Sequence, residues 1–265
     1  MKKILALILA LVLCASMVCV ASAETALEKV LAAGKLVVGT EATYPPYEYL
    51  DDNANFAGCD IWLAQQIADA LGVKLEVVDQ AFDGIIPAVQ AGGVDIGIAA
   101  FTCTPERAEV IDFSDLYETS AQLLIVKAAN GEKYVDKESL KGLKVGAQLG
   151  TIQSGLVESA LPDSELFELD TYPNLALETV NGNIAGFVVD YAVGMSMVNS
   201  SDGALEVANF EFSAEEASFG KACVLAKGSD DLLAKVNEVI AKVASDGSYQ
   251  AAYDAAVAAT GETGE

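Results

Sequence analysis

Strands and helices alternate along the first third of the chain, and this order restricts the fold more than any other feature. Apolar runs of strand length alternate with runs whose apolar residues recur at helical spacing. The expected elements are a helix over 25–33, strand 35–40, a helix over 61–72 with Asp60 as its N-cap, strand 73–78, a turn over 80–84, a helix over 85–93 and a strand over 94–98. A β-α-β-α-β order is typical of a parallel sheet with helices on both faces. We therefore predict an α/β fold.

The rest of the chain repeats this pattern and predicts a second lobe. The expected elements are strand 121–126, strand 143–148, a helix opened by Gly150-Thr151, a strand ending at 170–172, helix 174–182, strand 186–190, strand 217–227 and helices 229–245 and 248–259. The stretches 88–102 and 177–192 share the order helix, glycine turn, apolar strand and polar strand end. This weak internal repeat supports two similar lobes that face one cleft.

The stretch from Val94 to Arg107 predicts an anion-binding site. An apolar, β-branched run breaks into polar residues 102–105 and ends on an arginine. Ligands of open α/β sheets bind beyond the carboxyl ends of the strands, and a guanidinium can hold a carboxylate through two parallel hydrogen bonds. The alternative is a surface ion pair of Arg107 with Glu106 or Asp112. No other arginine occurs in the chain, which favours the binding role.

Composition excludes several classes of function. Histidine is absent, which excludes histidine-dependent catalytic triads and the usual zinc sites. Cys59, Cys103 and Cys223 show no CxxC spacing, so we expect small buried apolar residues rather than a disulfide framework or a metal site. The formal net charge of −24 predicts repulsion of nucleic acid and anionic lipid. We expect no nucleic-acid partner, no cofactor and no metal.

Residues 1–23 are typical of a signal peptide. A basic start, an apolar core and an A-x-A cleavage site follow one another and end at Ala23. A transmembrane anchor is disfavoured because the apolar run is short and no basic stop-transfer residues follow it. A lipid anchor at Cys14 or Cys19 is disfavoured because large apolar residues precede both cysteines. We expect an exported protein of the periplasm or the extracytoplasmic cell surface.

Five segments carry a resemblance to a known family: GTEATYPPYEYLDDNANFAGCDIWLAQQIADALG, DGIIPAVQAGGVDIGIAAFTCTPERAEVIDFSDLYETS, VGAQLGT, GFVVDYAV and KGSDDLLAKVNEVIAKVASDGSYQAAY. They resemble the family-3 extracellular solute-binding proteins, which bind polar amino acids for bacterial ABC importers. The TPER…DFSD…Y block is the most specific of them. The resemblance implies the two-lobed type II periplasmic-binding-protein fold, in which each lobe is a mostly parallel sheet flanked by helices and two crossover strands join the lobes.

The resemblance also implies domain boundaries. The first lobe would be discontinuous, built from residues 24–117 and 221–265. Hinge crossovers would lie at 118–121 and 217–220, and the second lobe would span 122–216.

Four residues match the family's positions for the charged groups of an amino acid. By the resemblance, Arg107 clamps the α-carboxylate and Thr102 assists it. Thr151 would add a donor at a helix N-terminus, where the helix dipole favours an anion. Asp190 would take the α-ammonium. The alternatives are surface ion pairs for Arg107 and Asp190, and a plain helix cap for Thr151.

Five more residues are expected to complete the cleft. The resemblance implies that Ala100 offers its carbonyl oxygen and that Tyr44 and Phe82 form aromatic walls, although both rings could instead belong to the core of the first lobe. Glu41 and Gln148 lie where side-chain specificity is set. Their acid and amide groups favour a polar or cationic ligand side chain over an aliphatic one.

The resemblance implies a monomeric capture protein that is not an enzyme. It would enclose a polar amino acid by hinge closure and deliver it to the permease of an ABC importer in the membrane. The alternative is a periplasmic dehydratase-like enzyme on the same scaffold, with Glu41 or Asp190 as general acid or base. The lack of histidine and of a nucleophile–base pair disfavours the enzyme.

Overall fold

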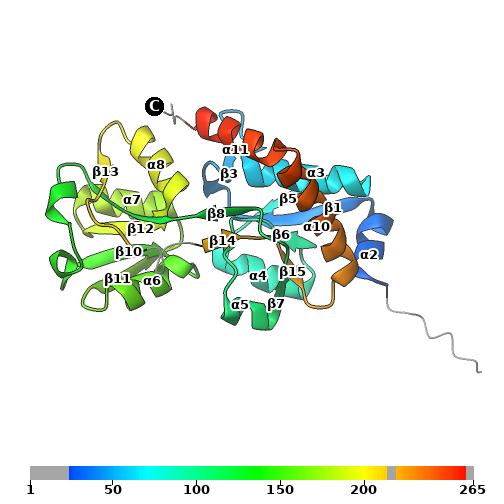
Figure 1. The fold of residues 1–265 in the computed structure, drawn as a ribbon, viewed down its shortest axis with the longest axis horizontal. Helices are drawn as coiled ribbons and strands as arrows, with labels where there is room; N and C mark the ends of the chain where they lie inside the picture. The colour runs from blue at the N-terminus through cyan, green and yellow to red at the C-terminus, as the bar shows by residue number, and fades with distance from the viewer. Residues whose placement is uncertain (1–23, 214–218, 261–265) are drawn as a thin grey trace, which may run out of the picture.

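A computed structural model describes residues 24–213 and 219–260 of the chain (Figure 1). Two α/β lobes lie side by side, and two neighbouring strands run between them. The predicted fold class is confirmed. The predicted signal peptide, with Cys14 and Cys19, lies outside the described residues.

The first lobe is built on a five-stranded sheet in the order β5-β1-β6-β15-β7. The strands are β1 (Lys35–Thr40), β5 (Lys74–Asp79), β6 (Ile96–Gly97), β7 (Ile111–Phe113) and β15 (Val224–Ala226). Strand β1 pairs in parallel with β5 and β6, while β15 is antiparallel to β6 and β7. A small antiparallel sheet of β2 (Thr43–Tyr44), β3 (Glu48–Leu50) and β4 (Phe56–Ala57) lies beside it.

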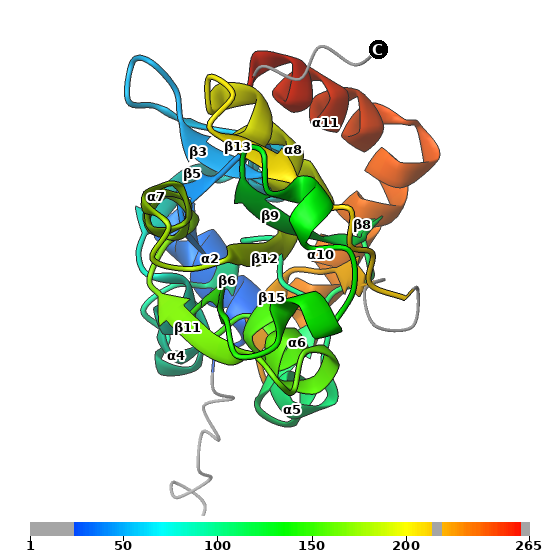
Figure 2. The same cartoon turned by 90° about the vertical axis from the view of Figure 1, so that its left-hand side faces the viewer.

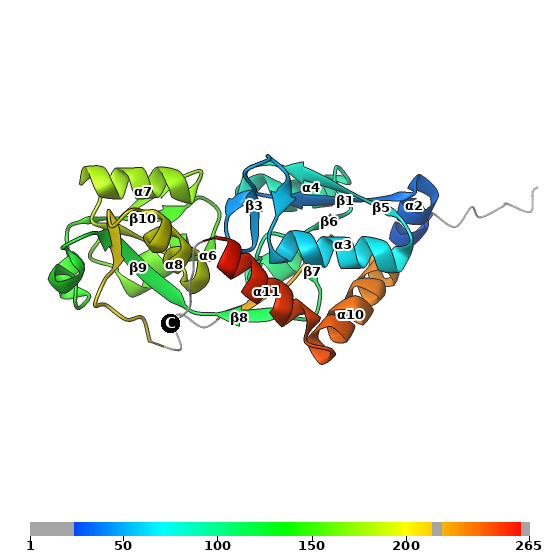
Figure 3. The same cartoon turned by 90° about the horizontal axis from the view of Figure 1, so that it is seen from above.

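Helices cover both faces of this sheet. They are α2 (Ala26–Ala33), α3 (Cys59–Leu71), α4 (Phe82–Ala91), α5 (Pro105–Val110), α10 (Asp230–Ser245) and α11 (Ser248–Ala259). Helices α3, α10 and α11 pack against one another on one side, and α4 lies on the other side against β1, β6 and β15 (Figure 3). The apolar face of α10 is buried at Leu232, Val236 and Ile240, as its helical spacing predicts.

The second lobe repeats the topology of the first. Its sheet has the order β11-β10-β12-β9-β13, with three parallel strands followed by an antiparallel one. The strands are β9 (Gln122–Lys127), β10 (Lys144–Gln148), β11 (Glu165–Leu169), β12 (Gly186–Asp190) and β13 (Leu205–Val207). Helices α6 (Ile152–Ala160), α7 (Tyr172–Asn181) and α8 (Tyr191–Ser200) lie around this sheet (Figure 2), and the 3-10 helices η1 (Gly131–Lys133) and η2 (Glu138–Leu140) follow β9.

The lobes are joined where β8 (Glu118–Ser120) pairs antiparallel with β14 (Phe219–Lys221). Glu118 lies opposite Lys221 in this register. The single strand predicted at 217–227 is two strands, because the chain first pairs with β8 and then inserts as β15 between β6 and β7. Of the second predicted crossover, 217–218 lies outside the described residues, and the predicted lobe boundaries stay a prediction.

Four further local predictions are wrong. The strand predicted to end at 170–172 ends at Leu169, and Tyr172 is already the first residue of α7. Asp60 does not cap α3; the N-cap is Gly58, and the Asp60 side chain points into the core. The turn predicted over 80–84 is shorter, since helix α4 begins at Phe82 and Gly84 lies in its first turn. Cys103 is exposed, whereas Cys59 and Cys223 are buried as expected. Within the described ranges, no helix is long and apolar enough to cross a membrane.

We predict that Gly186→Ala lowers the thermal unfolding midpoint. Gly186 lies in β12 between β10 and β9, and an added Cβ would overlap the carbonyl oxygen of Ile125. Overpacking of this kind costs about 1–3 kcal/mol of unfolding free energy. The control is Gly155→Ala in α6, where an added Cβ meets open space and should stabilise the helix by about 0.5–1 kcal/mol. Calorimetric midpoints that move in the same direction for both variants would contradict this packing.

Candidate functional site

A cavity lies between the two lobes and contains all nine predicted site residues in its wall. It encloses about 370 Å³, including the part open to solvent. The lining residues are Glu41, Tyr44, Glu48, Phe82, Ala99, Ala100, Thr102, Arg107, Gln148, Thr151, Ile152, Gln153, Asp190 and Lys221. Many follow strand ends, as with Glu41 after β1, Gln148 at the end of β10 and Asp190 at the end of β12. Ligands of α/β sheets bind at such edges.

Arg107 brings a positive charge to this cavity without a carboxylate beside it. Thr104 caps α5, and its Oγ1 accepts a hydrogen bond from the Arg107 N–H at 3.2 Å. The guanidinium donates to the carbonyl oxygens of Thr102 and Gly150, both at 2.9 Å, and so bridges the lobes. Burial lowers the Arg107 pKa to about 10, which leaves the group charged at neutral pH.

The surface ion pair considered for Arg107 is wrong. Asp112 instead accepts a hydrogen bond from Lys227 at 2.7 Å, and no carboxylate pairs with Arg107 in the part of the chain that the structure describes. The guanidinium lies over the rings of Phe82 and Phe101, at 5.5 and 5.4 Å from their centroids. Cation–π contacts hold the group in place without neutralising it.

Ala100 and Thr102 form the wall beside this guanidinium. Ala100 has φ of +48°, a left-handed conformation that costs free energy in a residue with a Cβ. Its N–H donates to the inward-pointing carboxylate of Asp60 at 2.8 Å, which holds the turn. Thr102 is buried and forms an isolated β-bridge with Lys221. The carbonyl role of Ala100 and the hydroxyl role of Thr102 stay predictions.

Thr151 and Gln148 form the facing wall in the second lobe. Thr151 is the N-cap residue of α6, but its side chain does not cap the helix; the hydroxyl donates to the Gln148 carbonyl at 2.6 Å. The alternative of a plain helix cap is therefore wrong. The Gln148 amide donates to the Asp170 carbonyl at 2.8 Å and to Glu41 at 3.4 Å, across the cleft.

Tyr44 and Phe82 line the cavity and also pack against other aromatic rings. The predicted role as cavity wall and the alternative role in packing are therefore both correct. The Tyr44 ring lies 5.8 Å from Tyr47 in its own lobe and 5.2 Å from Tyr172 in the other. Phe82 stacks on Phe101 at 4.7 Å between centroids. The rings give the cavity an apolar side next to its charged groups.

Two buried carboxylates face this apolar side. Glu41 is 4% exposed and accepts hydrogen bonds from Thr43 Oγ1 and Gln148 Nε2. Burial raises the Glu41 pKa. Glu48 is 1% exposed, and its Oε2 has no hydrogen-bond partner among the described residues. Burial, with Asp60 and Glu41 nearby, raises the Glu48 pKa well above its ordinary range.

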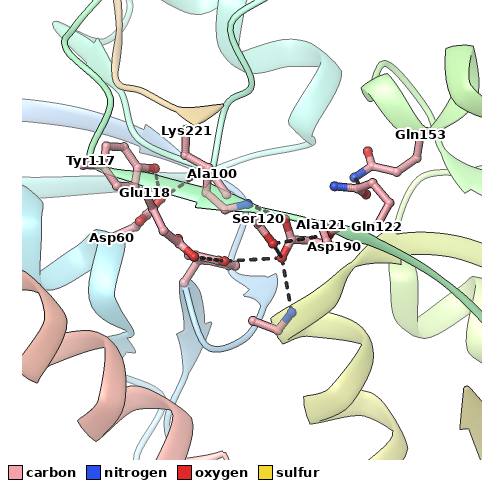
Figure 4. A network of polar contacts seen from close by, with 12 residues as sticks. Asp60, Ala100, Tyr117, Glu118, Ser120, Ala121, Gln122, Gln153, Asp190 and Lys221 are labelled. Atoms are coloured by element: carbon pink, nitrogen blue, oxygen red, sulfur yellow. Dashed lines mark hydrogen bonds and ion pairs between the residues drawn. The ribbon is translucent and has the colours of Figure 1, made fainter. Parts of the chain in front are cut away.

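Asp190 forms a buried ion pair with Lys221 (Figure 4). The two side chains are 2% and 3% exposed. Asp190 also accepts hydrogen bonds from Ser120 Oγ at 2.7 Å and from Tyr47 Oη and Ala192 N, both at 3.3 Å. Asp190 therefore does form an ion pair, but the pair is buried in the cleft and not at the surface, as the alternative had it.

Sequence reasoning missed Glu48, Lys221 and Gln153. Lys221 interrupts an otherwise apolar strand, and a charge at such a position indicates a buried partner or a site. Glu48 stands between Tyr47 and Tyr49 in a segment already assigned to the cleft, which was a usable signal. Gln153, whose amide donates to Gln122 at 2.7 Å, carried no signal of its own.

The cavity therefore has the groups that a zwitterion requires. Among the described residues, the Arg107 guanidinium lies at one side without a counter-ion, and Glu41 lies at another as a buried acid without a cation. Desolvation of such groups is costly unless a ligand of opposite charge replaces water. In the described part of the chain, no group of three or more histidine, cysteine, aspartate or glutamate residues could hold a metal ion.

Comparisons with known proteins agree with this geometry. The family model "Bacterial extracellular solute-binding proteins, family 3" matches residues 36–257. The L-cystine-binding protein TcyJ of Escherichia coli K12 is 32% identical over 228 residues, which cover 86% of this chain and 84% of that protein. The substrate-binding protein AbpA of an amino-acid ABC transporter from Streptococcus pneumoniae, bound to L-arginine, superposes with a TM-score of 0.85 at 31% identity and covers 89% of this chain and 100% of its own.

A third similar structure belongs to an ancestral amino-acid-binding protein described as a precursor of cyclohexadienyl dehydratase. It has a TM-score of 0.79 at 33% identity and covers 87% of this chain and 98% of its own. The family model spans most of the chain, and the relatives are matched over most of their length. The chain belongs to family 3 of the bacterial extracellular solute-binding proteins.

Proposed function

We propose that this substrate-binding component of an amino-acid ABC importer captures a cationic amino acid, with L-arginine as the first candidate. One observation carries the proposal. The Arg107 guanidinium has no carboxylate partner among the described residues, and it lines the same cavity as Glu41, a buried acid with no cation beside it there. A ligand with one carboxylate and a cationic side chain supplies the missing charge to both.

The carboxylate end of the ligand would lie against Arg107. Its guanidinium can turn from the carbonyl oxygens that it now contacts to a carboxylate, which is the stronger acceptor. Thr102 lies beside it, and the uncapped N-terminus of α6 at Thr151 adds N–H groups and a favourable dipole.

The side-chain end would lie between Tyr44 and Phe82 and reach Glu41. The rings suit an aliphatic stem, and Glu41, held by Gln148, suits a guanidinium or an ammonium. The similarity to an arginine-bound substrate-binding protein supports this choice among the polar amino acids.

We propose that Asp190 takes the α-ammonium and that hinge closure encloses the ligand. Binding of one amino acid by both walls would favour the closed form, in which Arg107 reaches the second lobe at Gly150. The closed form would be the one that the permease in the membrane recognises. We also propose an exported, monomeric protein whose first 23 residues are removed.

A dehydratase is the second candidate, because an ancestral relative is described as a precursor of such an enzyme. Glu48 is a buried acid whose pKa is raised, which a general acid requires. The test is a turnover assay with a cyclohexadienyl acid. If the wild type converts it and Glu48→Gln does not, the proposal of a binding protein without enzymatic activity is wrong.

A thermal-shift screen of the twenty amino acids with ornithine and cystine tests the main proposal. A ligand at 100 times its Kd stabilises the folded protein by about 2.7 kcal/mol. L-Arginine should raise the unfolding midpoint most, with lysine and ornithine next. If no amino acid raises the midpoint, the capture function is wrong; if only aliphatic ones do, the cationic assignment is wrong.

We predict that Arg107→Ala abolishes the shift that L-arginine causes. Loss of one partner from a buried, hydrogen-bonded charge pair costs about 2–5 kcal/mol of binding free energy. The control is Lys35→Ala, which removes a surface charge paired with Glu76 at the far end of β1 and should keep the full shift. Calorimetric titration of both variants gives the Kd values, and an unchanged Kd in Arg107→Ala would contradict the clamp.

We predict that Glu41→Gln changes the specificity of the cleft. The variant keeps a hydrogen-bonding amide beside Gln148 but loses the charge that a guanidinium would meet. The affinity for L-arginine should fall by a factor of about 10–100, while that for L-glutamine, a neutral ligand of similar length, should change little. Equal losses for both ligands would show that Glu41 supports the fold rather than the side-chain position.

The affinity for L-arginine should rise with pH above the ordinary carboxyl range. Burial raises the Glu41 pKa in the free protein, and a bound guanidinium favours the ionised form, so binding below the raised pKa releases a proton. Kd should therefore fall as pH rises and level off once Glu41 is ionised before binding. Titrations between about pH 5 and pH 8 measure the slope. Glu41→Gln should flatten it, and an unaltered slope in that variant would assign the proton to another group.

A further inference from the structure

The Asp190 carboxylate, where an amino-acid ligand would place its α-ammonium, is already filled by the chain's own lysine (Figure 4). We propose that Lys221 is a specificity-determining residue that competes with the ligand's ammonium for Asp190. When an amino acid binds, Lys221 moves to neighbouring carboxylates of the hinge. This inference rests on the proposed capture of an amino acid.

The Asp190 carboxylate is already neutralised while Lys221 holds it. Oδ2 binds the Lys221 ammonium, and Oδ1 accepts from Ser120 Oγ and Ala192 N. The Tyr47 hydroxyl has one proton and lies closer to Glu118 Oε1, at 2.9 Å, than to Asp190 Oδ1, at 3.3 Å. Both members of the pair are almost fully buried, which prevents water from taking the place of either. Two ammonium groups on one buried carboxylate would repel each other, so an incoming ammonium would displace Lys221.

Three other carboxylates lie near Lys221 and can receive it: those of Asp60 and Glu48, which are buried, and that of Glu118, which is partly exposed. Glu118 lies directly opposite Lys221 in the pairing of β8 with β14. Glu118 Oε2, Asp60 Oδ1 and Glu48 Oε2 are each buried without a hydrogen-bond partner among the described residues. Burial would lower the Lys221 pKa, but Asp190, Glu118 and Asp60 together raise it. The ammonium thus has more acidic neighbours than it can satisfy at once.

The exchange keeps both ammonium groups beside a carboxylate. The ligand's ammonium replaces the Lys221 ammonium on Asp190, and Lys221 then neutralises Glu118, whose pKa burial raises to about 7. The lysine stem is long and flexible, so its ammonium can move between the two carboxylates. The Tyr47 ring lies 4.5 Å from Lys221 Nζ, and the Tyr47 hydroxyl contacts both Glu118 and Asp190. Because Lys221 belongs to a crossover strand, the exchange occurs at the hinge itself.

The competition sets which ligands the cleft accepts. The ammonium of an amino acid binds Asp190 only if the Asp190–Lys221 ion pair breaks. It therefore contributes less binding free energy than it would in a cleft whose aspartate has no internal partner. A ligand without an amino group leaves Lys221 in place. Lys221 therefore weakens binding of amino acids relative to their deamino analogues.

Calorimetric titration of Lys221→Met at pH 8 tests this, with L-arginine and with 5-guanidinopentanoate, which is arginine without its α-amino group. In the variant, only arginine can neutralise Asp190, so its Kd should fall by a factor of about 10 or more, since an unpaired buried carboxylate is strongly destabilising. The analogue should gain nothing. Lys227→Met, which removes a lysine paired with Asp112 at the surface, is the matched control and should leave both Kd values unchanged.

A second variant covers the case in which Lys221→Met fails to fold. Glu118→Gln keeps an acceptor for the Tyr47 hydroxyl but removes the charge that receives the displaced lysine. The Kd of L-arginine should rise by a factor of about 3–10, because the displaced ammonium loses its anion, and the Kd of the analogue should not change. Glu118 does not line the cavity, so a direct contact with the ligand cannot cause this result.

The outcomes separate the two proposals. The competition is wrong if the wild type binds an amino acid and neither variant changes the Kd of L-arginine. In that case Lys221 is a fixed structural partner of Asp190. If neither the wild type nor Lys221→Met binds any amino acid, the capture function itself is wrong. If Lys221→Met binds L-arginine and the wild type does not, the competition is supported, since Lys221 then prevents binding altogether.

Discussion

The antiparallel pairing of β8 with β14 is the constraint on which the rest of the structure depends. It holds two sheets of the same topology with their strand ends toward one cavity, and it brings Glu118 opposite Lys221 at the junction. The strands are close-packed here, since a Cβ at Gly220 would overlap the side chain of Leu116. The junction between the lobes is therefore closely packed, and of its two charged groups Lys221 lies in the wall of the cavity.

Apart from the Asp190–Lys221 pair, the cleft contains charged and acidic groups that lack an ion-pair partner among the described residues. Arg107 is held by carbonyl oxygens and aromatic rings, which leave its charge uncompensated. Burial raises the pKa of Glu41 and of Glu48, and the nearby carboxylates of Asp60 and Glu41 raise that of Glu48 further. Unpaired buried charge costs folding free energy, and a ligand of matching charge recovers it. The features that make the cleft costly to fold thus also make it bind.

Local signals in the sequence predicted most elements, because helical spacing and apolar runs depend only on neighbouring residues. Strand 35–40 and helix 248–259 match the structure. Helix α5 was missed although Thr104-Pro105 is a typical start, with a capping hydroxyl followed by proline at the first helical position. Asp60 was misassigned because its partner, the N–H of Ala100, lies 40 residues away, and a cap is the only role that neighbouring residues suggest for it.

The site was predictable as far as strand ends determine it, and the nine predicted residues do line one cavity. The partner of Asp190 was not, because Lys221 lies 31 residues away in the sequence and comes close to it only through the pairing of β14 with β8. A lysine inside an apolar strand predicts a buried acid nearby but does not say which one. Here four acids lie close to one ammonium, and Asp190 is the one that holds it. Because the other three stay within its surroundings, the proposed exchange with a ligand's ammonium would leave Lys221 an anion to move to.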